Sequence, residues 1–160
     1  MAVKEGDKIP SAKLKVKTSE GVKDVSTDEY FKGKKVVLFA LPGAFTPTCS
    51  AKHVPSFVQN YDALKQKGVD KIACVSVNDA FVMEAWGRDQ KCDSKIDMLA
   101  DGNAEFTKAM GLEMDASGYG MGTRSKRYAM VVDNGVIKKL NVEQPGAFEV
   151  SSAEAVMKAL

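Results

Sequence analysis

Residues 35–50 read KVVLFALPGAFTPTCS, and this stretch of sequence decides the fold. The unbroken apolar run Val36–Leu41 is typical of a strand that is covered on both faces. The pair Pro42–Gly43 then signals a tight turn. Thr46 suits the N-cap of a helix, and Pro47 suits its first position, where a missing N–H costs nothing. The stretch therefore predicts a buried strand, a turn and the start of a helix.

Cys49 falls at the third position of this predicted helix, where backbone N–H groups have no partner within the helix. Only a thiolate acts as a nucleophile, and the partial positive charge of a helix N-terminus favours the anion. A buried structural cysteine is the commoner state of this residue type. Because the neighbours Thr46, Thr48 and Ser50 are polar, we interpret Cys49 as a reactive thiolate.

Length and composition are those of one ordinary globular domain, which we place at residues 1–160. Of the 160 residues, 44% are hydrophobic and 28% are charged, as in most soluble domains. The formal net charge of +2 is too small to indicate a nucleic-acid or membrane partner, so we expect neither.

The N-terminal residues lack the apolar core of a signal peptide, and no apolar run approaches the roughly 18 residues that span a membrane. An Arg- and Ser-rich transit peptide is also absent, so the cytoplasm is the expected location. A cleaved organellar transit peptide would leave no trace in a mature chain.

The three cysteines, Cys49, Cys74 and Cys92, are odd in number and widely spaced, unlike a secreted disulfide framework. Cys92 lies in a polar segment and is predicted to be an exposed surface thiol. Cys49 and the single histidine, His53, are close enough to share a helix face. Two ligands do not make a zinc site, so we expect no metal and no cofactor.

Periodicity and breaker residues predict an α/β domain with a mixed central sheet flanked by helices. Strands are expected at 12–18, 22–25, 36–41, 71–77, 95–99, 128–132 and 136–142. Helices are expected at 49–67, from the Asn78–Asp79 cap to 87–89, at 103–110 and at 151–160. The sheet should be parallel in the middle and antiparallel at one side, with an N-terminal β-hairpin extension.

Local signals refine this pattern. Pro55 has no N–H for the Ala51 carbonyl and predicts a kink in the 49–67 helix. Residues 113–123 are rich in glycine and predict a mobile loop. Asp133–Gly135 predicts a hairpin turn between the last two strands.

The spacing Pro42-x-x-x-Thr46-x-x-Cys49 resembles the peroxidatic motif of the peroxiredoxins, and Gly43–Ser50 is similar to their type II, or peroxiredoxin 5, subfamily. Similar segments follow in order along nearly the whole chain, at 52–55, 75–79, 86–87, 100–102, 124–127 and 141–143. The resemblance implies a thioredoxin-like fold. It also implies an antioxidant thiol peroxidase that reduces hydrogen peroxide and alkyl hydroperoxides through a sulfenic acid intermediate.

The resemblance further implies roles for individual residues. Cys49 would be the peroxidatic nucleophile, and Arg124 would be the cation that holds its thiolate and polarises the peroxide. The Thr46 hydroxyl would bond the peroxide oxygens, and Pro42 would wall the pocket. Backbone N–H groups of Gly43 and Cys49 would complete a cradle for negative charge.

Arg127 and His53 are weaker candidates for the site. Arg127 begins a predicted strand and could pair with an acidic neighbour. His53 lies one helical turn beyond Cys49 and could face the rim of the pocket.

The sulfenic acid at Cys49 must be reduced by another thiol. Plant-type members of the subfamily use a cysteine at the position of Cys74 as this resolving thiol. Other members place it near the C-terminus, where residues 148–152 of this chain have none. The resemblance therefore leaves Cys74, or direct reduction by glutathione, glutaredoxin or thioredoxin. Relatives often dimerise through loops near the active site, which favours a homodimer.

Two alternative functions stay open at this point. A thiol–disulfide oxidoreductase of the thioredoxin kind is disfavoured by the missing Cys-x-x-Cys motif. A non-enzymatic redox relay or peroxide sensor, which passes oxidation from Cys49 to a partner protein, would use the same thiolate as the peroxidase.

Overall fold

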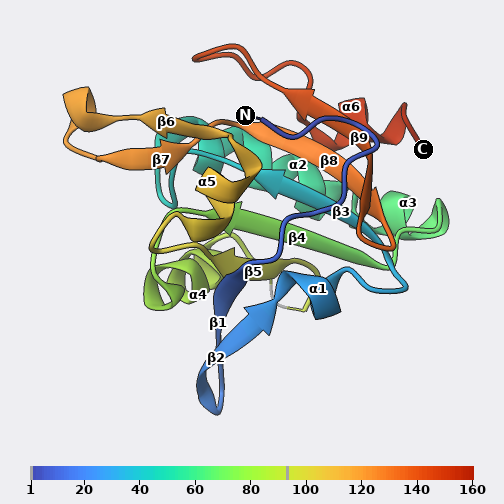
Figure 1. Cartoon of the computed structure of the whole chain (residues 1–160), viewed down its shortest axis with the longest axis horizontal. Helices are drawn as coiled ribbons and strands as arrows, with labels where there is room; N and C mark the ends of the chain where they lie inside the picture. Colours follow the sequence, from blue (N-terminus) through green and yellow to red (C-terminus); the bar gives the residue numbers. More distant parts are fainter. Residues whose placement is uncertain (1, 93) are drawn as a thin grey trace.

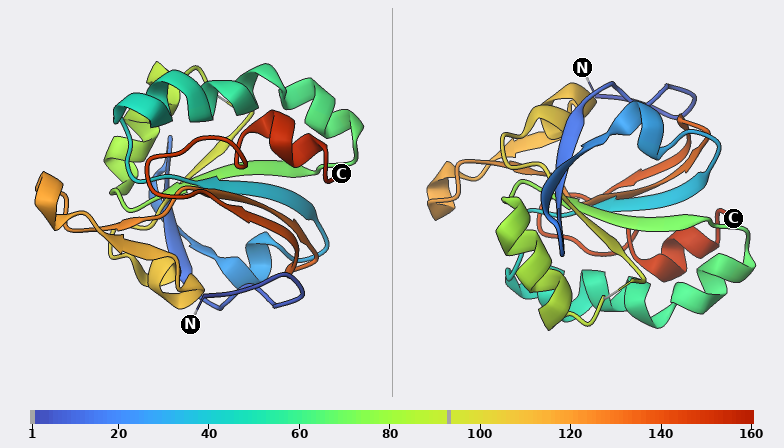
Figure 2. Two further views of the ribbon diagram at one scale, coloured as in Figure 1. Left: turned by 90° about the horizontal axis from the view of Figure 1, so that it is seen from above. Right: turned by 90° about the horizontal axis from the view of Figure 1, so that it is seen from below.

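A seven-stranded mixed sheet runs through the middle of the molecule, and helices cover both of its faces (Figure 1, Figure 2). The computed structural model describes residues 2–92 and 94–160. In chain order the strands are β1 (Lys13–Thr18), β2 (Gly21–Ser26), β3 (Lys35–Ala40), β4 (Lys71–Ser76), β5 (Asp97–Ala100), β8 (Tyr128–Asp133) and β9 (Val136–Val142). Across the sheet the order is β2-β1-β5-β4-β3-β8-β9.

The central pairs of the sheet, β3–β4 and β4–β5, are parallel, as predicted. On one side β8 and β9 continue the sheet in antiparallel fashion. On the other side the β1–β2 hairpin joins β5, also antiparallel, through Lys15 and Ala100. The predicted antiparallel side is therefore present, and a second one arises because the N-terminal hairpin docks on the edge that β5 leaves open.

The helices are α1 (Thr27–Tyr30), α2 (Val54–Gln59), α3 (Tyr61–Gln66), α4 (Ala80–Asp89), α5 (Glu105–Met110) and α6 (Ala153–Met157). Figure 2 shows α2, α3, α4 and α6 on one face of the sheet, with α1 and α5 on the other. Strand β3 contributes side chains to the apolar clusters on both faces of the sheet. Val37 and Phe39 point into one apolar cluster, while Val36 and Leu38 point into the other. All four side chains are fully buried, which confirms that this strand is covered on both faces.

The segment after β3 begins its helix at Pro47, as predicted. The Thr46 carbonyl accepts the first backbone hydrogen bond of this helix, from the Ser50 N–H at 3.0 Å. The chain therefore leaves the central strand and enters a helix within a few residues, which places Cys49 at the carboxyl end of β3.

The predicted 49–67 helix is interrupted twice. Cys49–His53 form a π-helical turn, in which the following N–H reaches back to the Cys49 carbonyl. This wide turn lies next to Pro55, whose ring cannot supply an N–H to the preceding turn. A second break at Asn60 separates α2 from α3. The disturbance expected at Pro55 thus includes a π-turn, and a single helix with one kink was the wrong description.

Residues 113–123, predicted as a loop, contain a small second sheet. Strand β6 (Glu113–Asp115) pairs antiparallel with β7 (Thr123–Ser125), and a 3-10 turn at Ser117–Tyr119 lies between them. This hairpin, which we call the β6–β7 arm, projects from the body of the molecule (Figure 1). Strands this short are below the length at which alternation can be recognised in a sequence, so the pattern missed them.

Side-chain signals at the ends of elements were more reliable. Asp79 caps α4 by accepting the Val82 N–H, as predicted. Asn134 and Gly135 adopt φ angles of 49° and 80° and form the predicted hairpin turn between β8 and β9. Helix α6 ends at Met157, earlier than predicted. Within the described residues, no helix has the length and apolar character needed to cross a membrane.

Candidate active site

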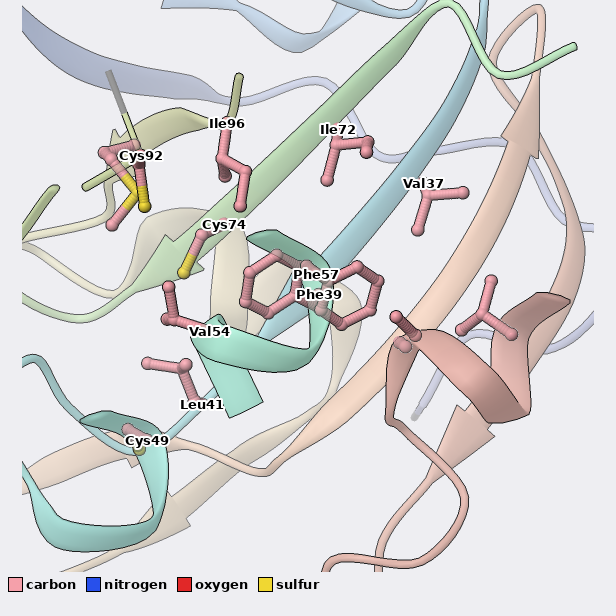
Figure 3. Close-up of a cluster of buried hydrophobic side chains, with 14 of the residues drawn as sticks. Val37, Phe39, Leu41, Cys49, Val54, Phe57, Ile72, Cys74, Cys92 and Ile96 are labelled. Atoms are coloured by element: carbon pink, nitrogen blue, oxygen red, sulfur yellow. The ribbon is translucent and has the colours of Figure 1, made fainter. Parts of the chain in front are cut away.

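Cys49 lies in the first turn of the helix that follows β3, with its side chain buried among Leu41 and Val54 (Figure 3). Its sulfur nevertheless has a charged hydrogen-bond donor. The Nη2 atom of Arg127 donates to Cys49 Sγ at 3.1 Å. A guanidinium in this position can satisfy a thiolate in a setting that is closed to bulk water.

The hydrogen bond to the sulfur that was expected of Arg124 comes from Arg127 in the structure. Arg124 donates to two backbone carbonyls instead. Its Nη1 atom lies 3.2 Å from the Pro42 oxygen, and its Nε atom lies 3.1 Å from the Met121 oxygen. Arg124 therefore connects the β6–β7 arm to the loop before Cys49 without a hydrogen bond to the sulfur.

The register of the sheet explains which arginine reaches the sulfur. Tyr128 in β8 pairs with Ala40, the last residue of β3. Arg127 precedes Tyr128 and therefore stands beside the point at which the chain leaves β3 for the cysteine loop. Arg124 belongs to β7 of the arm and lacks this pairing. A prediction that paired the strand at 128–132 antiparallel with 36–41 would have favoured Arg127.

His53 was a weak candidate for the pocket rim, but it is fully buried and contacts Arg127. Its Nδ1 atom lies 2.8 Å from Nη1 of Arg127, and its Nε2 atom lies 2.9 Å from the Ser151 carbonyl oxygen. Because a guanidinium only donates, Nδ1 accepts and the ring proton sits on Nε2. Burial, with the charge of Arg127 adding to it, lowers the pKa of His53 to about 3.

The free energy of unfolding is expected to fall as the pH is lowered from about 6.5 to about 3, with a contribution from His53 of about 1.4 kcal/mol per pH unit. In this window the imidazole takes up a proton in the unfolded chain but stays neutral in the folded one. Above about pH 6.5 it is neutral in both states and contributes no pH dependence. Urea unfolding of wild type and His53→Asn measures the effect. The stability advantage of wild type should shrink as the pH falls, and a pH-independent difference would contradict the prediction.

The loop between β3 and the helix is held by its own polar groups. The Thr46 hydroxyl donates to the Gly43 carbonyl at 2.6 Å, and the Ala44 N–H donates to Asn78 Oδ1 at 2.9 Å. A Cβ atom added at Gly43 would lie 2.7 Å from Nη1 of Arg124, so a larger residue here would displace the end of the Arg124 side chain. Asn78, which the sequence indicated only as part of a helix cap, thus supports the cysteine loop.

The first helical turn is also tied to α4. The indole Nε1–H of Trp86 donates to Ser50 Oγ at 3.0 Å. The ring of Phe45 lies 6.3 Å from the Trp86 ring, centroid to centroid. Phe45 itself has a positive φ of 64°, which is unusual for a bulky residue, and its side chain is 54% exposed.

A cavity of about 450 Å³ opens beside Arg127. Pro42 and Thr48 line it from the cysteine loop, and Met114 and Tyr119 line it from the β6–β7 arm. The remaining lining consists of Lys126, Val142, Glu143, Gln144, Pro145, Gly146 and Ala147. The guanidinium of Arg127 thus borders a space whose walls come from stretches of chain far apart in the sequence.

Cys74 lies inside β4, hydrogen-bonded between β3 and β5. It is fully buried, and burial raises the pKa of its thiol well above the ordinary value. In Figure 3 the side chains of Leu41 and Val54 lie between Cys74 and Cys49. A disulfide between these two cysteines therefore requires the first helical turn to move.

Cys92 was predicted to be an exposed surface thiol, and this prediction was wrong. Its side chain is buried in the same apolar cluster as Cys74 and Ile96 (Figure 3). Lys91 adopts a left-handed φ of 59°, and the Cys92 N–H donates to the Gly87 carbonyl at 2.9 Å. The backbone thus turns the cysteine back under the end of α4, although the residues around it are polar.

No group of three His, Cys, Asp or Glu side chains that could hold a metal ion occurs in residues 2–92 and 94–160. Both ring nitrogens of His53 already contact protein atoms.

Comparisons with known proteins bear on the fold and the chemistry together. The chain matches the Redoxin family over residues 4–157. It is 52% identical to "Peroxiredoxin-2E, chloroplastic" from Arabidopsis thaliana, with 99% of this chain and 70% of that one covered. Reduced Prx3 from Vibrio vulnificus in complex with hydrogen peroxide is 57% identical, with a TM-score of 0.95 and 98% of each chain covered. Peroxiredoxin 5 from Alvinella pompejana is 36% identical, with a TM-score of 0.88 and coverage of 98% of this chain and 97% of that one.

Proposed function

This chain belongs to the peroxiredoxins, as a type II member of these thiol-dependent peroxidases. From that premise we propose that Cys49 is its peroxidatic residue and that Arg127 is the cation that stabilises the Cys49 thiolate. The observation that carries the proposal is the 3.1 Å hydrogen bond from Arg127 Nη2 to Cys49 Sγ at the start of a helix. Both features favour a thiolate, which is the reactive form.

In the proposed reaction the Cys49 thiolate attacks one oxygen of the peroxide. A sulfur–oxygen bond forms, the oxygen–oxygen bond breaks, and the leaving oxygen takes up a proton to become water or an alcohol. Cys49 is oxidised to a sulfenic acid while the peroxide is reduced. Arg127 stabilises the charge that develops on the leaving oxygen. The Thr46 hydroxyl donates to Gly43, so its oxygen lone pairs remain available to accept a peroxide O–H.

Backbone N–H groups of Gly43 and Cys49 complete the proposed site, with Pro42 as one wall. Arg124 acts at a distance from the sulfur in this proposal, because it holds the Pro42 carbonyl and the β6–β7 arm. The cavity beside Arg127 is large enough for an alkyl hydroperoxide as well as hydrogen peroxide.

The enzyme must then be returned to its reduced form by thiols. We propose that Cys74 resolves the sulfenic acid, with release of water and formation of a Cys49–Cys74 disulfide, and that glutathione, glutaredoxin or thioredoxin reduces the product. The π-turn at Cys49–His53 supports this order of events, because an interrupted helix start is easier to rearrange than a regular one. Direct reduction of Cys49 by one of these external thiols is the alternative.

Intact-mass analysis of Cys74→Ser tests the resolving step. After treatment with an equimolar amount of hydrogen peroxide, the wild type is expected to lose two thiol hydrogens and to yield a Cys49–Cys74 cross-linked peptide. Cys74→Ser should instead accumulate sulfenic acid on Cys49, or a glutathione adduct when glutathione is present. Cys92→Ser is the matched control and should form the same disulfide as wild type. If wild type and Cys74→Ser both accumulate only the adduct, Cys74 is structural. Steady-state peroxide consumption with each reductant supplied separately identifies the physiological class of thiol.

A homodimer is proposed for this chain. Its support is the exposure of large apolar side chains beside the site, with Phe45 at 54% and Tyr119 at 86%. Phe45 follows the turn before Cys49, and Tyr119 lies in the β6–β7 arm. Light scattering at several protein concentrations would test the proposal, and a monomer at all of them would contradict it.

Residues 1–160 are proposed to form a single domain, since one sheet takes its strands from both ends of the chain. The cytoplasmic location stays a prediction. The Arabidopsis relative is named as chloroplastic, which makes an organellar location the alternative for this chain.

A further inference from the structure

Glu143 is a buried carboxylate that the proposed reaction does not use. Its side chain is only 7% exposed, yet one of its oxygens accepts four hydrogen bonds. The donors are the backbone N–H groups of Glu149, Val150 and Ser151, each at 2.8 Å, and the Ser151 hydroxyl at 2.7 Å. Burial disfavours the charged form, but these hydrogen bonds outweigh it and lower the pKa of Glu143. The carboxylate is therefore the centre around which the loop at 144–151 folds.

The 144–151 loop reaches the active site through two groups. The Ser151 carbonyl accepts the hydrogen bond from Nε2 of His53 at 2.9 Å. The Phe148 ring lies 5.0 Å from the His53 ring, and the Arg127 guanidinium carbon lies 6.0 Å from the Phe148 ring centroid. The loop thus fixes both the tautomer and the surroundings of the histidine.

His53 in turn fixes the plane of the guanidinium. One terminal nitrogen of Arg127 donates to His53 Nδ1 at 2.8 Å, and the other donates to Cys49 Sγ at 3.1 Å. A planar fork held at both terminal nitrogens has little freedom to rotate away from the sulfur. If the histidine bond were lost, the guanidinium would keep its hydrogen bond to the sulfur but lose the second bond that fixes its plane.

Glu143 also holds the other end of the same arginine. Its backbone N–H donates to the Arg127 carbonyl oxygen at 2.9 Å, next to the pairing of Tyr128 with Val142. A continuous series of contacts therefore links the backbone of Arg127 to its own side chain. It runs from the Arg127 backbone through Glu143, the 144–151 loop and His53, and returns to the Arg127 side chain.

We propose that Glu143 is a positioning residue for peroxide reduction: it shapes the 144–151 loop so that the Ser151 carbonyl sets the His53 tautomer that aims Arg127 at the Cys49 sulfur. The inference rests on the roles proposed above for Cys49 and Arg127. It assigns a catalytic consequence to a carboxylate that touches neither the sulfur nor the substrate.

The test compares Glu143→Ala with Glu143→Gln in the full-length chain. The readouts are the stopped-flow rate with hydrogen peroxide and the pH dependence of Cys49 alkylation by iodoacetamide, with the alkylated site identified by peptide mapping. Glu143→Ala is expected to move the alkylation midpoint to higher pH and to slow the peroxide reaction about ten-fold, through misplacement of the guanidinium. Glu143→Gln keeps an acceptor oxygen and should change the rate only about two-fold.

Asp101 offers a matched control. It too is buried and accepts hydrogen bonds, from the Phe106 N–H, the Thr107 N–H and the Thr107 hydroxyl, but these bonds hold the start of α5 and none of them involves Cys49, His53 or Arg127. Asp101→Ala and Asp101→Asn should lower stability without moving either readout. If the Asp101 variants move both readouts as far as the Glu143 variants do, loss of stability alone explains the effect and the proposal is wrong.

Two histidine variants locate the step at which Glu143 acts. His53→Asn keeps an acceptor near the position of Nδ1 for Arg127, whereas His53→Gln keeps a donor near the position of Nε2 for the Ser151 carbonyl. His53→Gln is expected to shift the alkylation midpoint more than His53→Asn does. In the His53→Gln background the route through the histidine is lost and only the Phe148 ring still faces the guanidinium, so adding a Glu143 change should have much less effect on the midpoint than in wild type. A full and additive effect of the second change would overturn the proposal.

These outcomes separate the inference from the function on which it rests. If Cys49→Ser keeps its activity, or if loss of the Arg127 guanidinium changes nothing, the proposed function fails. If those residues behave as proposed and folded Glu143 variants match wild type in both readouts, only the role of Glu143 fails. Should Glu143→Ala not fold, Glu143→Leu, which fills much of the same space without an acceptor oxygen, takes its place with the same expected results.

Discussion

Replacement of Cys49 by serine is expected to reduce the rate of peroxide consumption by a factor on the order of 10⁴ or more. A serine hydroxyl is not ionised near neutral pH, even with Arg127 beside it, and its oxygen cannot be oxidised to an equivalent of the sulfenic acid. The substitution removes one polarisable atom from a packed site, so the fold should be retained. The measurement is steady-state peroxide consumption with an excess of reducing thiol.

Cys92→Ser is the control for this experiment. It makes the same chemical change in the same apolar cluster, but Cys92 has no proposed part in the reaction. We expect it to lower stability and to keep the activity. Peroxidase activity that survives in Cys49→Ser and is lost in Cys92→Ser would contradict the assignment of the nucleophile.

Replacement of Arg127 by glutamine is expected to slow the reaction of Cys49 with hydrogen peroxide by about 10²- to 10³-fold. The change removes the donor that lies 3.1 Å from the sulfur, together with the charge that stabilises the leaving oxygen. Arg127→Lys should be intermediate, because the ammonium keeps the charge but cannot contact His53 and Cys49 through one planar fork. Stopped-flow kinetics under single-turnover conditions isolates this step.

Arg124→Gln is the matched comparison, because it removes the same group from a residue close by. Arg124 donates only to the Pro42 and Met121 carbonyls among the contacts found here, so the loss should stay below about ten-fold. If Arg124→Gln costs more than Arg127→Gln, the arginine that the sequence resemblance first indicated is the catalytic one.

The strand, turn and helix at residues 35–50 could be predicted because each signal is local. Unbroken apolar residues, a Pro–Gly pair and a proline at the first helical position act on their immediate neighbours. The caps at Asp79 and Ser152 are of the same kind, since each accepts an N–H from a residue close in sequence. Local signals also led us to centre the candidate site on Cys49.

The features that could not be predicted depend on pairing over long distances or on single backbone angles. The choice between Arg124 and Arg127 needed the register of β8 against β3. The burial of Cys92 depends on the left-handed conformation of Lys91, which no composition reveals. The polar neighbours of Cys92 suggested that the cysteine is exposed, but its side chain is buried.

The contacts among the supporting residues of the site could not be predicted for the same reason. His53 meets the Ser151 carbonyl across 98 positions of sequence, and Arg127 meets His53 across 74. Glu143 and Ser151 carry no motif that distinguishes them from other residues of a polar loop. Only the fold brings them together, so only the structure indicates that a carboxylate after β9 bears on a sulfur after β3.

The hydrogen bond from Trp86 to Ser50 gives the molecule an optical reporter of its own chemistry. The chain has one tryptophan, so its fluorescence comes from a single buried indole that is bound to the residue after the reactive cysteine. Any opening of the first helical turn breaks that bond and admits water to the ring. The emission of the unlabelled protein should therefore follow the oxidation and reduction of Cys49 in real time.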